Sequence, residues 1–490
     1  MTVSSGQFRL RALTYVLLFC VASDYAFAQT EAADFARIGY AGYISAVVSD
    51  YQCVGVNPAN LGFIPTSEIF DLSTPMAAGV EIRRRNFAFT VLEGGVSLHS
   101  DALNREGLLE MITQTSEGSF SEEDKRAAAE SFIDKGVRFN IDVIVLGASA
   151  QTQQYGGFAF TWRERIGGTY LFNESASRLA FEGRYFDYFD SSYVNFDGDT
   201  VGVSTDPKFY SELFDGTRLS TLWFRELGLS YGYRVADGDH VDLYLGIGAK
   251  YLMGYAYVDA FVENGSLQAR SSLSPFFGIS YGKVTSPSLL SGTDFVPVGS
   301  GWSIDLGATV TYDAWSFSFS VVDIGRMNWD GNVFVAKDTV LNGLTSTGFE
   351  SFNIFEEAPK ITGEGNFFKW EGLNATSSDL PLRIRLGTAW DINKYWNVGA
   401  DLIYPMNQAS GSLGEPIFSV GADYRPLTWF RFGFGLGGGG NMGVFLPFSF
   451  LFSLFDNTWE LGISSRDAIT YVFTDRPILS GVVGVARIRL

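Results

Sequence analysis

Residues 303–321 read SIDLGATVTYDAWSFSFSV, and this stretch decides the fold. Apolar side chains occupy every second position of residues 304–312 and again of residues 315–321, and the turn Asp313-Ala314 separates the two runs. Alternation with a period of two puts apolar side chains on one face of a β-strand and polar ones on the other. The stretch therefore predicts an antiparallel hairpin with one apolar and one polar face.

Three more hairpins of this kind follow toward the C-terminus. They pair residues 382–390 with 395–404, 417–424 with 429–436, and 444–455 with 459–464. A last alternating segment, 481–490, ends the sequence. Connections within the hairpins are short, whereas those between hairpins differ widely in length, a contrast typical of outer-membrane β-barrels. The pattern therefore predicts an all-β, transmembrane, antiparallel barrel.

Further alternating segments precede these hairpins. They begin near Val137, Tyr155, Gly168, Leu222, Val241, Tyr255 and Leu267, and an additional pair lies between Ala77 and Leu98. All segments together give about 16 strands, in a range of roughly 14 to 18 because segment boundaries read from one sequence are imprecise. The sequence has no composition break or Pro/Ser-rich linker, so we expect one barrel over residues 67–490 rather than several soluble domains.

The N-terminus has the features of a secretion signal. Arg9 and Arg11 form a basic start, residues 12–22 are apolar, and Ala26-Phe27-Ala28 places small residues where a signal peptidase reads them. The apolar run is too short for a transmembrane helix, which needs about 20 residues. We expect residues 1–28 to be a signal peptide cleaved after Ala28, and the mature protein to reach the cell outer membrane.

Composition excludes several classes of function. The formal charge of the chain is −19 at pH 7, and without the basic patch that neutralises phosphates we expect no nucleic-acid partner. Only Cys53 remains after cleavage, so no intramolecular disulfide can form. This cysteine and the two histidines, His99 and His240, cannot form a zinc cluster and offer little for nucleophilic catalysis. We expect no cofactor, no metal site and no enzymatic activity.

Nine charged residues fall on the polar phase of the predicted strands, with signs that alternate roughly from strand to strand. They are Asp305, Arg383, Arg385, Asp401, Asp423, Arg431, Glu460, Arg487 and Arg489. We expect them to line the lumen, and we expect the two arginines of segment 382–390 to pair with Asp401 and Asp305. Two interpretations stay open: such pairs close the interior by salt bridges, or they form the constriction of a pore.

Four tryptophans each follow a predicted short turn. They are Trp315, Trp396, Trp429 and Trp459. An amphipathic indole ring suits the level where lipid meets water, so we expect these residues to belong to an aromatic girdle. The alternative is aromatic packing in a water-soluble β-sandwich. More than a dozen half-apolar segments would leave such a sandwich no place for its aromatic faces, so the barrel is favoured.

Residues 101–135 form a region with helical features. Leu108, Leu109 and Ile112 share one helical face, and Ser121 opens a second helix with a capping-type start. If the short turns are periplasmic, the parity of the predicted strands puts this helical insertion on the periplasmic side. It is then either a docking element for a periplasmic protein partner or a solvated linker.

The last segment, 481–490, resembles the terminal strand that the barrel-assembly machinery reads. Such strands usually end in an aromatic residue, whereas this sequence ends in Leu490. We expect outer-membrane lipid and the barrel-assembly machinery to be the partners of the barrel itself.

Six stretches, in order from about residue 220 to the end, carry a family resemblance. They are Trp223-Phe224-Arg225-Glu226-Leu227-Gly228, Ile304-Asp305-Leu306-Gly307, Asp323-Ile324-Gly325 followed by Trp329, Leu380-Pro381-Leu382-Arg383-Ile384-Arg385-Leu386-Gly387, Gly421-Ala422-Asp423-Tyr424-Arg425-Pro426, and Trp459-Glu460-Leu461-Gly462-Ile463-Ser464-Ser465-Arg466-Asp467. Together they resemble an uncharacterised family of outer-membrane β-barrels, common in Bacteroidetes-type bacteria and defined only as a domain of unknown function. The resemblance implies a barrel and names no substrate.

A weaker resemblance rests on Asn57-Pro58-Ala59, which continues as Asn60-Leu61. This motif is similar to one that follows the mature N-terminus in the long-chain fatty-acid transporter superfamily, whose N-terminal segment plugs the barrel. By resemblance, residues 29–66 form a plug-like segment in the lumen. The other interpretation is an ordinary turn before the first strand.

Two functions remain after these exclusions. The first is transport or passage of small solutes across the outer membrane, extended to hydrophobic solutes by the transporter resemblance. The second is a closed-lumen structural or interaction barrel that docks other envelope proteins. Both need the same lipid-facing strands, so the sequence alone leaves both open.

Overall fold

The computed structural model describes most of the barrel and its connections. The described residues are 39–63, 66–70, 80–108, 120–352, 369–467 and 478–490, apart from positions 197, 280, 282–283, 414 and 441–442. The expected signal peptide lies outside these residues, as does the expected helical stretch 109–119. For residues 66–70 and 80–84 only the backbone is described.

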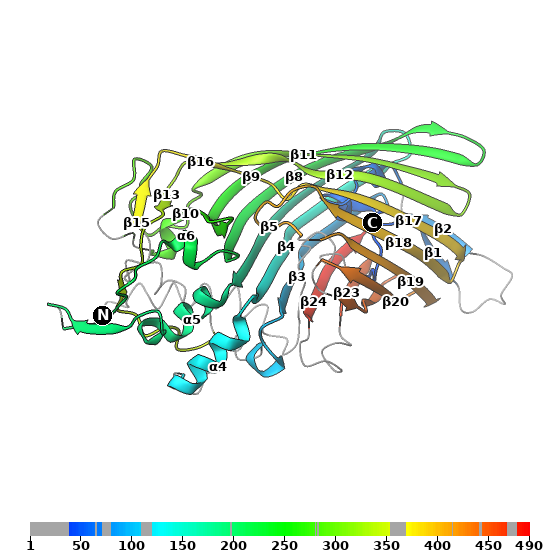
Figure 1. Ribbon diagram of the computed structural model, residues 1–490. Coiled ribbons are helices and arrows are strands. Elements are labelled where there is room, and N and C mark those ends of the chain that lie inside the picture. Colours follow the sequence, from blue (N-terminus) through cyan, green and yellow to red (C-terminus); the bar gives the residue numbers. More distant parts are fainter. Residues whose placement is uncertain are drawn as a thin grey trace, which may run out of the picture.

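Antiparallel strands pair side by side into a closed barrel with a wall of 14 strands among the described residues (Figure 1). In order around the wall they are β3 (Phe87–Ser100), β4 (Lys135–Thr152), β5 (Gly156–Phe172), β8 (Arg218–Asp237), β9 (Val241–Glu263), β11 (Gly299–Tyr312), β12 (Trp315–Trp329), β17 (Arg383–Asn393), β18 (Trp396–Pro405), β19 (Ile417–Leu427), β20 (Phe430–Gly439), β22 (Phe448–Leu454), β23 (Trp459–Ser465) and β24 (Ile478–Arg489). Strand β24 pairs with β3, which closes the ring. The predicted all-β barrel is therefore confirmed.

The predicted number of about 16 strands is too high, and the observed wall lies at the lower end of the expected range. The segments expected to begin near Tyr155 and Gly168 both belong to β5, and those near Val241 and Tyr255 both belong to β9. Strand β5 contains the pair Gly167-Gly168, which interrupts its alternation. Long strands with such interruptions look like two strands in the sequence.

The early pair of strands expected between Ala77 and Leu98 also contributes only one wall strand, β3. The other member, β2 (Val80–Arg84), pairs with β1 (Thr66–Phe70) in a separate two-stranded sheet.

The two ends of the barrel differ. Short turns follow β4, β8, β11, β17, β19 and β22 at one end, here called the turn end, where the backbone of Leu490 bonds to that of Phe87. The opposite end, the loop end, carries the longer connections and most of the smaller elements (Figure 1). These elements are α4 (Glu122–Phe132), α5 (Glu174–Glu182), η3 (Gly183–Tyr185), β6 (Ser191–Val194), β7 (Thr200–Val203), α6 (Tyr210–Leu213), β10 (Ser266–Leu273), η4 (Pro275–Phe277), β13 (Val333–Lys337), β14 (Gly343–Leu344), β15 (Lys369–Gly372), β16 (Thr376–Asp379) and β21 (Val444–Phe445).

The helical insertion lies at the loop end, not at the end of the short turns as predicted. Strand β3 runs from Phe87 at the turn end to Ser100 at the loop end, and α4 follows it. Three segments expected after the insertion, those near Gly168, Tyr255 and Leu267, are not separate wall strands, and an odd number of extra strands reverses the end at which the insertion is placed. The predicted start at Ser121 is confirmed, since its side chain and that of Asp124 cap each other's backbone N–H.

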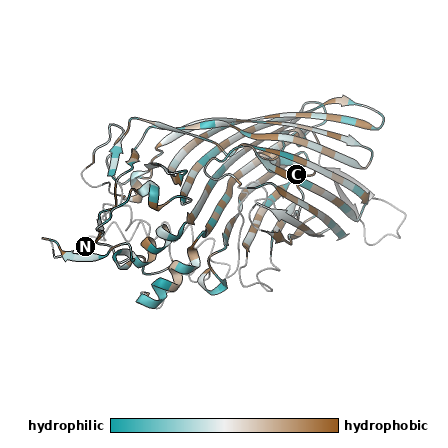
Figure 2. Ribbon diagram, viewed as in Figure 1, coloured by the Kyte–Doolittle hydropathy of each residue, from teal (hydrophilic) through white to brown (hydrophobic). Residues whose placement is uncertain are grey.

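Hydrophobic and hydrophilic residues alternate along the wall strands (Figure 2), and the burial of alternate residues shows that the apolar ones face outward and the polar ones face the lumen. Phe317 and Phe319 are 49% and 45% exposed, whereas Ser318 and Ser320 are 6% and 1% exposed. A bilayer requires an apolar outer face on a transmembrane barrel. It also requires the barrel to be closed, because closure leaves no backbone group unpaired at an edge. Among the described residues, no helix is long and apolar enough to cross a membrane.

The four tryptophans expected in an aromatic girdle all lie at the turn end. Trp315 stacks on Trp390 of the adjacent strand at 5.1 Å between ring centroids, and Trp396 stacks on Tyr424 at 4.5 Å. Trp315 and Trp429 are exposed, and the indole of Trp459 donates to the Val485 carbonyl.

Candidate functional site

The lumen holds a separate stretch of chain, residues 39–63, here called the inner segment. It contains two short 3-10 helices, η1 (Asp50–Cys53) and η2 (Pro58–Gly62), and most of its side chains are buried. Helix η2 contacts β5, β8, β9 and β11, while η1 contacts β3, β4 and β5. The Asn57-Pro58-Ala59 motif starts η2, where Asn57 accepts a hydrogen bond from the Ala59 N–H at 3.1 Å.

Glycines on the inner face of the wall let this segment come close. A Cβ atom on Gly246 would lie 2.3 Å from the Ala59 nitrogen, and one on Gly421 would lie 2.0 Å from the Ala41 oxygen. Any larger residue at these positions would collide with backbone, so glycine is required by close approach.

A belt of charged side chains runs around the inner face of the wall. The charged belt comprises Glu93, Asp142, Arg163, Arg165, Glu226, Lys250, Asp305, Asp323, Arg383, Arg385, Asp401, Asp423, Arg431, Glu460, Arg487 and Arg489. Acidic and basic members are equal in number, and each wall strand except β22 contributes at least one. Arg431 and Arg489 have side chains 12% and 17% exposed, and the others are buried.

Asp323 is the hub of the belt. Its carboxylate lies 2.7 Å from Lys250, 3.1 Å from Arg165 and 3.0 Å from Arg383. Asp323 has a positive φ of 63° at a point where the β11–β12 register shifts, so Val322 and Asp323 are consecutive residues that are both buried. A β-bulge of this kind redirects a side chain, here toward the lumen.

Further ion pairs extend the belt on both sides of the hub. Arg165 lies 3.0 Å from Glu226, Arg163 pairs with Asp142, and Lys250 lies 2.7 Å from Asp305. Buried charges are costly unless they are paired, and every belt carboxylate except Glu93, which accepts from neutral donors, lies in an ion pair.

The structure brings all nine charged residues predicted for the lumen into this belt. The expected Arg385–Asp401 pair is present at 3.8 Å, but Arg383 pairs with Asp323 instead of Asp305. Sequence reasoning missed the other seven members of the belt, which are Glu93, Asp142, Arg163, Arg165, Glu226, Lys250 and Asp323. The run Arg163-Glu164-Arg165, with two charges two residues apart, was the available signal.

One carboxylate of the inner segment joins the belt. Asp50 is the only charged residue of residues 39–63. Its Oδ2 accepts hydrogen bonds from Arg487 and Arg489, each at 2.7 Å, and both arginines also face Glu460, at 3.2 and 3.6 Å. Asp50 itself has a positive φ of 59°, so its backbone is held in a conformation that residues other than glycine rarely adopt.

Neutral side chains of the inner segment bind other belt members. The Tyr43 hydroxyl donates to Asp423 at 2.8 Å, and Glu93 accepts hydrogen bonds from Tyr51 and, at 2.6 Å, from Gln52. The inner segment therefore completes the hydrogen bonding of the wall as well as filling its lumen.

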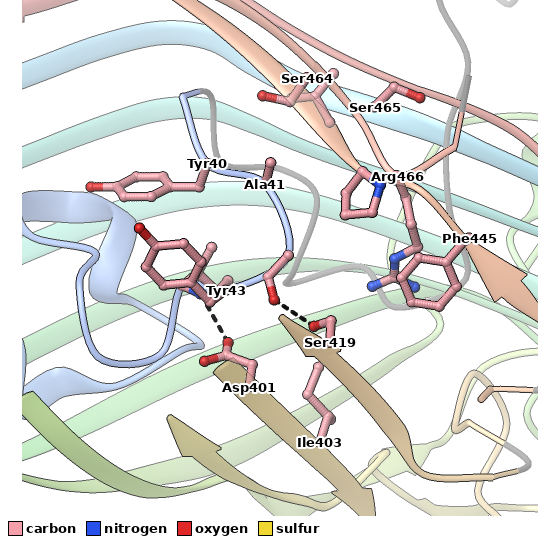
Figure 3. A pocket seen from close by; sticks show the side chains of 14 residues that line it. Tyr40, Ala41, Tyr43, Asp401, Ile403, Ser419, Phe445, Ser464, Ser465 and Arg466 are labelled. Atoms are coloured by element: carbon pink, nitrogen blue, oxygen red, sulfur yellow. Dashed lines mark hydrogen bonds between the residues drawn. The ribbon is translucent and has the colours of Figure 1, made fainter. Parts of the chain in front are cut away.

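Wall side chains also bind the main chain of the inner segment. Asp401 accepts hydrogen bonds from the N–H groups of Ile44 at 2.9 Å and Ser45 at 3.0 Å, and Ser419 donates to the Gly42 carbonyl at 2.5 Å. Figure 3 shows Asp401 and Ser419 pointing toward this part of the segment. A cavity of about 50 Å³ lies beside it, lined by residues 40–44 and by wall residues.

A second cavity lies near the loop end and is apolar. It measures about 70 Å³ and is formed by α5, β8, β9 and β10, with Leu179, Phe214, Leu219 and Phe261 among its lining residues. It does not include any member of the charged belt.

The described residues hold no group of three potential metal-binding side chains. The two histidines lie at opposite ends of the barrel: His240 bonds to Asp313 at the turn end at 2.8 Å, and His99 lies near the loop end of β3. They cannot act together in one site.

Comparison of sequences assigns a family pattern to most of the chain. The Family of unknown function (DUF5723) matches residues 90–456. This range includes five of the six stretches that carried the family resemblance. No curated protein is similar enough to count as a match.

Comparison of structures finds barrels of similar size at low similarity. The toluene transporter TodX of Pseudomonas putida is 12% identical with a TM-score of 0.41, covering 95% of this chain and 99% of its own. The toluene transporter TbuX of Ralstonia pickettii is 13% identical with a TM-score of 0.39, covering 93% and 99%. A FadL homologue of Pseudomonas aeruginosa is 11% identical with a TM-score of 0.34, covering 94% and 95%.

Proposed function

We propose that this chain, which belongs to the Family of unknown function (DUF5723), passes small polar solutes across the outer membrane. The family names no substrate, so the proposal rests on the residues of the lumen. In this proposal the inner segment is a plug that closes the lumen at the charged belt. Signal-peptide cleavage after Ala28, insertion into outer-membrane lipid and recognition of β24 by the barrel-assembly machinery belong to the same proposal.

The observation that carries the proposal is how the lumen is filled. A barrel built only as a scaffold can fill its interior with side chains from its own wall. Here a separate segment fills it, held by ion pairs and hydrogen bonds that are distinct from the strand pairing of the wall, so the segment can leave while the wall stays paired. Asp50 and its two arginines form the one salt-bridged contact between the inner segment and the belt in the part of the chain that the structure describes.

The belt favours polar solutes over the hydrophobic ones that the transporter resemblance suggested. A solute passing the belt meets paired carboxylates and guanidinium groups on nearly every wall strand. An apolar molecule would gain nothing there and would displace the hydrogen bonds that the inner segment now supplies. The apolar cavity near the loop end is the observation that favours a hydrophobic solute, but it lies away from the belt.

Conductance in planar bilayers tests this proposal with the variant Asp50→Asn. The substitution keeps the shape of the side chain and removes the charge that both arginines bind. We expect rare openings in the wild type and frequent openings in Asp50→Asn, because a broken buried ion pair costs about 3 to 5 kcal/mol.

Asp379→Asn is the matched control, since Asp379 pairs with Arg326 at 3.0 Å on the exposed outside, with side chains 58% and 67% exposed. It should behave as the wild type. If neither the wild type nor Asp50→Asn conducts ions or admits small sugars into liposomes, the proposed passage is wrong.

The second candidate is a closed-lumen interaction barrel, and one surface favours it. Strands β6 and β7 form a hairpin near the loop end in which Tyr193, Val194 and Phe196 are exposed. Solvent-exposed aromatic residues on a protruding hairpin are common in protein contacts. Two results together would favour this function. The Asp50→Asn variant would not conduct, and replacing Tyr193 and Phe196 with serine would remove an envelope protein that co-purifies with the wild type.

A further inference from the structure

The wall recognises the inner segment largely through its main chain. Side chains of five wall strands bind backbone groups of the segment: they accept from the N–H groups of residues 39, 44 and 45 and donate to the carbonyls of residues 42, 56, 61 and 63. The donors and acceptors are Ser464, Asp401, Ser419, Ser320 and Gln151. Contacts of this type depend on a peptide backbone and little on its sequence.

The wall also presents a site for one carboxylate. Asp50 places its Oδ2 between Arg487 and Arg489, at 2.7 Å from each. Both guanidinium groups lie on β24, and both are held in place by Glu460 of the neighbouring strand. Two fixed guanidinium groups around one oxygen would bind the terminal carboxylate of a free ligand as they bind the side chain of Asp50.

The side chains between these two anchoring points are small. Residues 45–50 read SAVVSD; Ala46 packs with Ala389 of the wall, and Val48 belongs to an apolar cluster with Ala88 and Ile144. The backbone anchor at Asp401 and the carboxylate anchor at the two arginines are therefore six residues apart along the segment, in its own folded conformation.

We propose that, when the inner segment leaves, its docking groups bind short peptides with a free C-terminal carboxylate. In this proposal the inner segment is a peptide ligand built into the chain, and Asp50 stands in for the terminal carboxylate. The inference rests on the proposed function and narrows its solutes to peptides of about six residues with small side chains. Mixed charges along the belt suit a zwitterion better than a hydrocarbon or a fatty acid.

The test measures binding to the full-length, detergent-solubilised protein. The probes are a fluorescent hexapeptide of alanine and serine with a free carboxylate, the same peptide as its C-terminal amide, and octanoate as a competitor. The intact segment competes as an intramolecular ligand at an effective concentration in the millimolar range. We therefore expect Asp50→Asn to bind the free-carboxylate peptide at least tenfold more tightly than the wild type does, and at least tenfold more tightly than it binds the amide.

Two further variants connect the binding to the two anchors. In the Asp50→Asn background, Arg487→Gln should abolish the difference between carboxylate and amide. Asp401→Asn should weaken peptide binding several-fold and leave octanoate unaffected, because the Asp401 carboxylate accepts from backbone N–H groups, which octanoate lacks. Heat-modifiable gel migration checks that each variant is folded, and wild-type protein with roughly a hundredfold more peptide replaces Asp50→Asn if that variant does not fold.

The outcomes separate this inference from the proposed function. Octanoate that displaces the peptide as well as unlabelled peptide does would overturn the peptide site, since the wall would then bind only the carboxylate. An Asp50→Asn barrel that conducts but binds no peptide overturns the peptide site and leaves the passage function standing. Peptide binding without any conductance would support the site and contradict passage.

Discussion

At the scale of single residues, Phe319 tests which face of the wall meets lipid. It lies near the middle of the expected span of β12 and is 45% exposed on the outside. An arginine at the bilayer midplane costs about 2 to 4 kcal/mol in a transmembrane barrel. We expect Phe319→Arg to lower the free energy of unfolding from lipid vesicles by that amount, and Phe319→Leu to lower it far less. Equal effects would mean that this face does not contact lipid.

Asp323 tests whether the belt stabilises the barrel as a connected network. It faces three cations, all of them buried. Asp323→Asn would remove a negative charge that these three cations share. We expect the free energy of unfolding, measured with urea in vesicles, to fall by about 3 to 5 kcal/mol. The exposed pair of Asp379 with Arg326 provides the comparison, because surface pairs contribute about 0 to 1 kcal/mol. Similar losses for Asp323→Asn and Asp379→Asn would contradict the hub.

Which residues face inward could be predicted wherever the alternation is regular. Nine members of the belt followed from the phase of strands with clear turns on one side. Asp323 could not, because the bulge puts two consecutive residues on the inner side and breaks the period of two on which the prediction depends. Arg163 and Lys250 were missed because each lies in the middle of a strand that the sequence seemed to divide.

At the scale of elements, Gly421 tests whether the position of the inner segment depends on its close contact with β19. A methyl group at this position of β19 would overlap the Ala41 carbonyl, so Gly421→Ala should push the segment away from the wall. We expect faster proteolysis within residues 39–63 and more frequent channel openings, while gel migration shows a folded barrel. Gly438→Ala on β20 is the control, since its nearest non-neighbouring atom would lie 3.5 Å away. Unchanged proteolysis in Gly421→Ala would show that the segment adjusts without leaving its place.

At the scale of elements, the limits and the pairing of the strands were harder to predict than the presence of strands. The turns of the hairpins from residue 303 onward were predicted in their observed places because each turn is short, but the wall strands there have 7 to 15 residues, and β12 continues to Trp329 beyond the predicted end at residue 321. Before residue 303 the strands reach up to 23 residues and extend beyond the expected bilayer at the loop end. Their outer parts pair with each other and with insertions such as β10, and pairing between distant segments leaves no mark in local alternation.

At the scale of the whole molecule, charge is distributed unevenly. The belt is balanced, with equal numbers of acidic and basic members. The described residues of two loop-end connections, 101–108 with 120–134 and 173–217 without 197, instead contain 15 acidic and 6 basic residues. The described part of these connections therefore has a net charge of −9 at one end of the barrel. A solute that enters there meets an acidic entrance before it reaches a neutral belt.

The acidic entrance predicts selectivity in the open state. Fields of one sign at a channel mouth raise the local concentration of counter-ions. We expect Asp50→Asn channels in a potassium chloride gradient to favour potassium over chloride by about threefold at 0.1 M salt. The preference should fall toward unity at 1 M, where the Debye length shrinks from about 10 Å to about 3 Å.

Charge variants at the two ends show where the selectivity arises. Asp187 and Asp206 are exposed in a loop-end connection, and Asp237 and Asp239 are exposed at the turn end. In the Asp50→Asn background, replacing the first pair with asparagine should reduce the preference for potassium more than replacing the second pair does. A larger effect at the turn end would mean that ions are selected there. Anion preference in every variant would mean instead that the arginines released from Asp50 control the open lumen, since two guanidinium groups that share only Glu460 would then outweigh the more distant carboxylates.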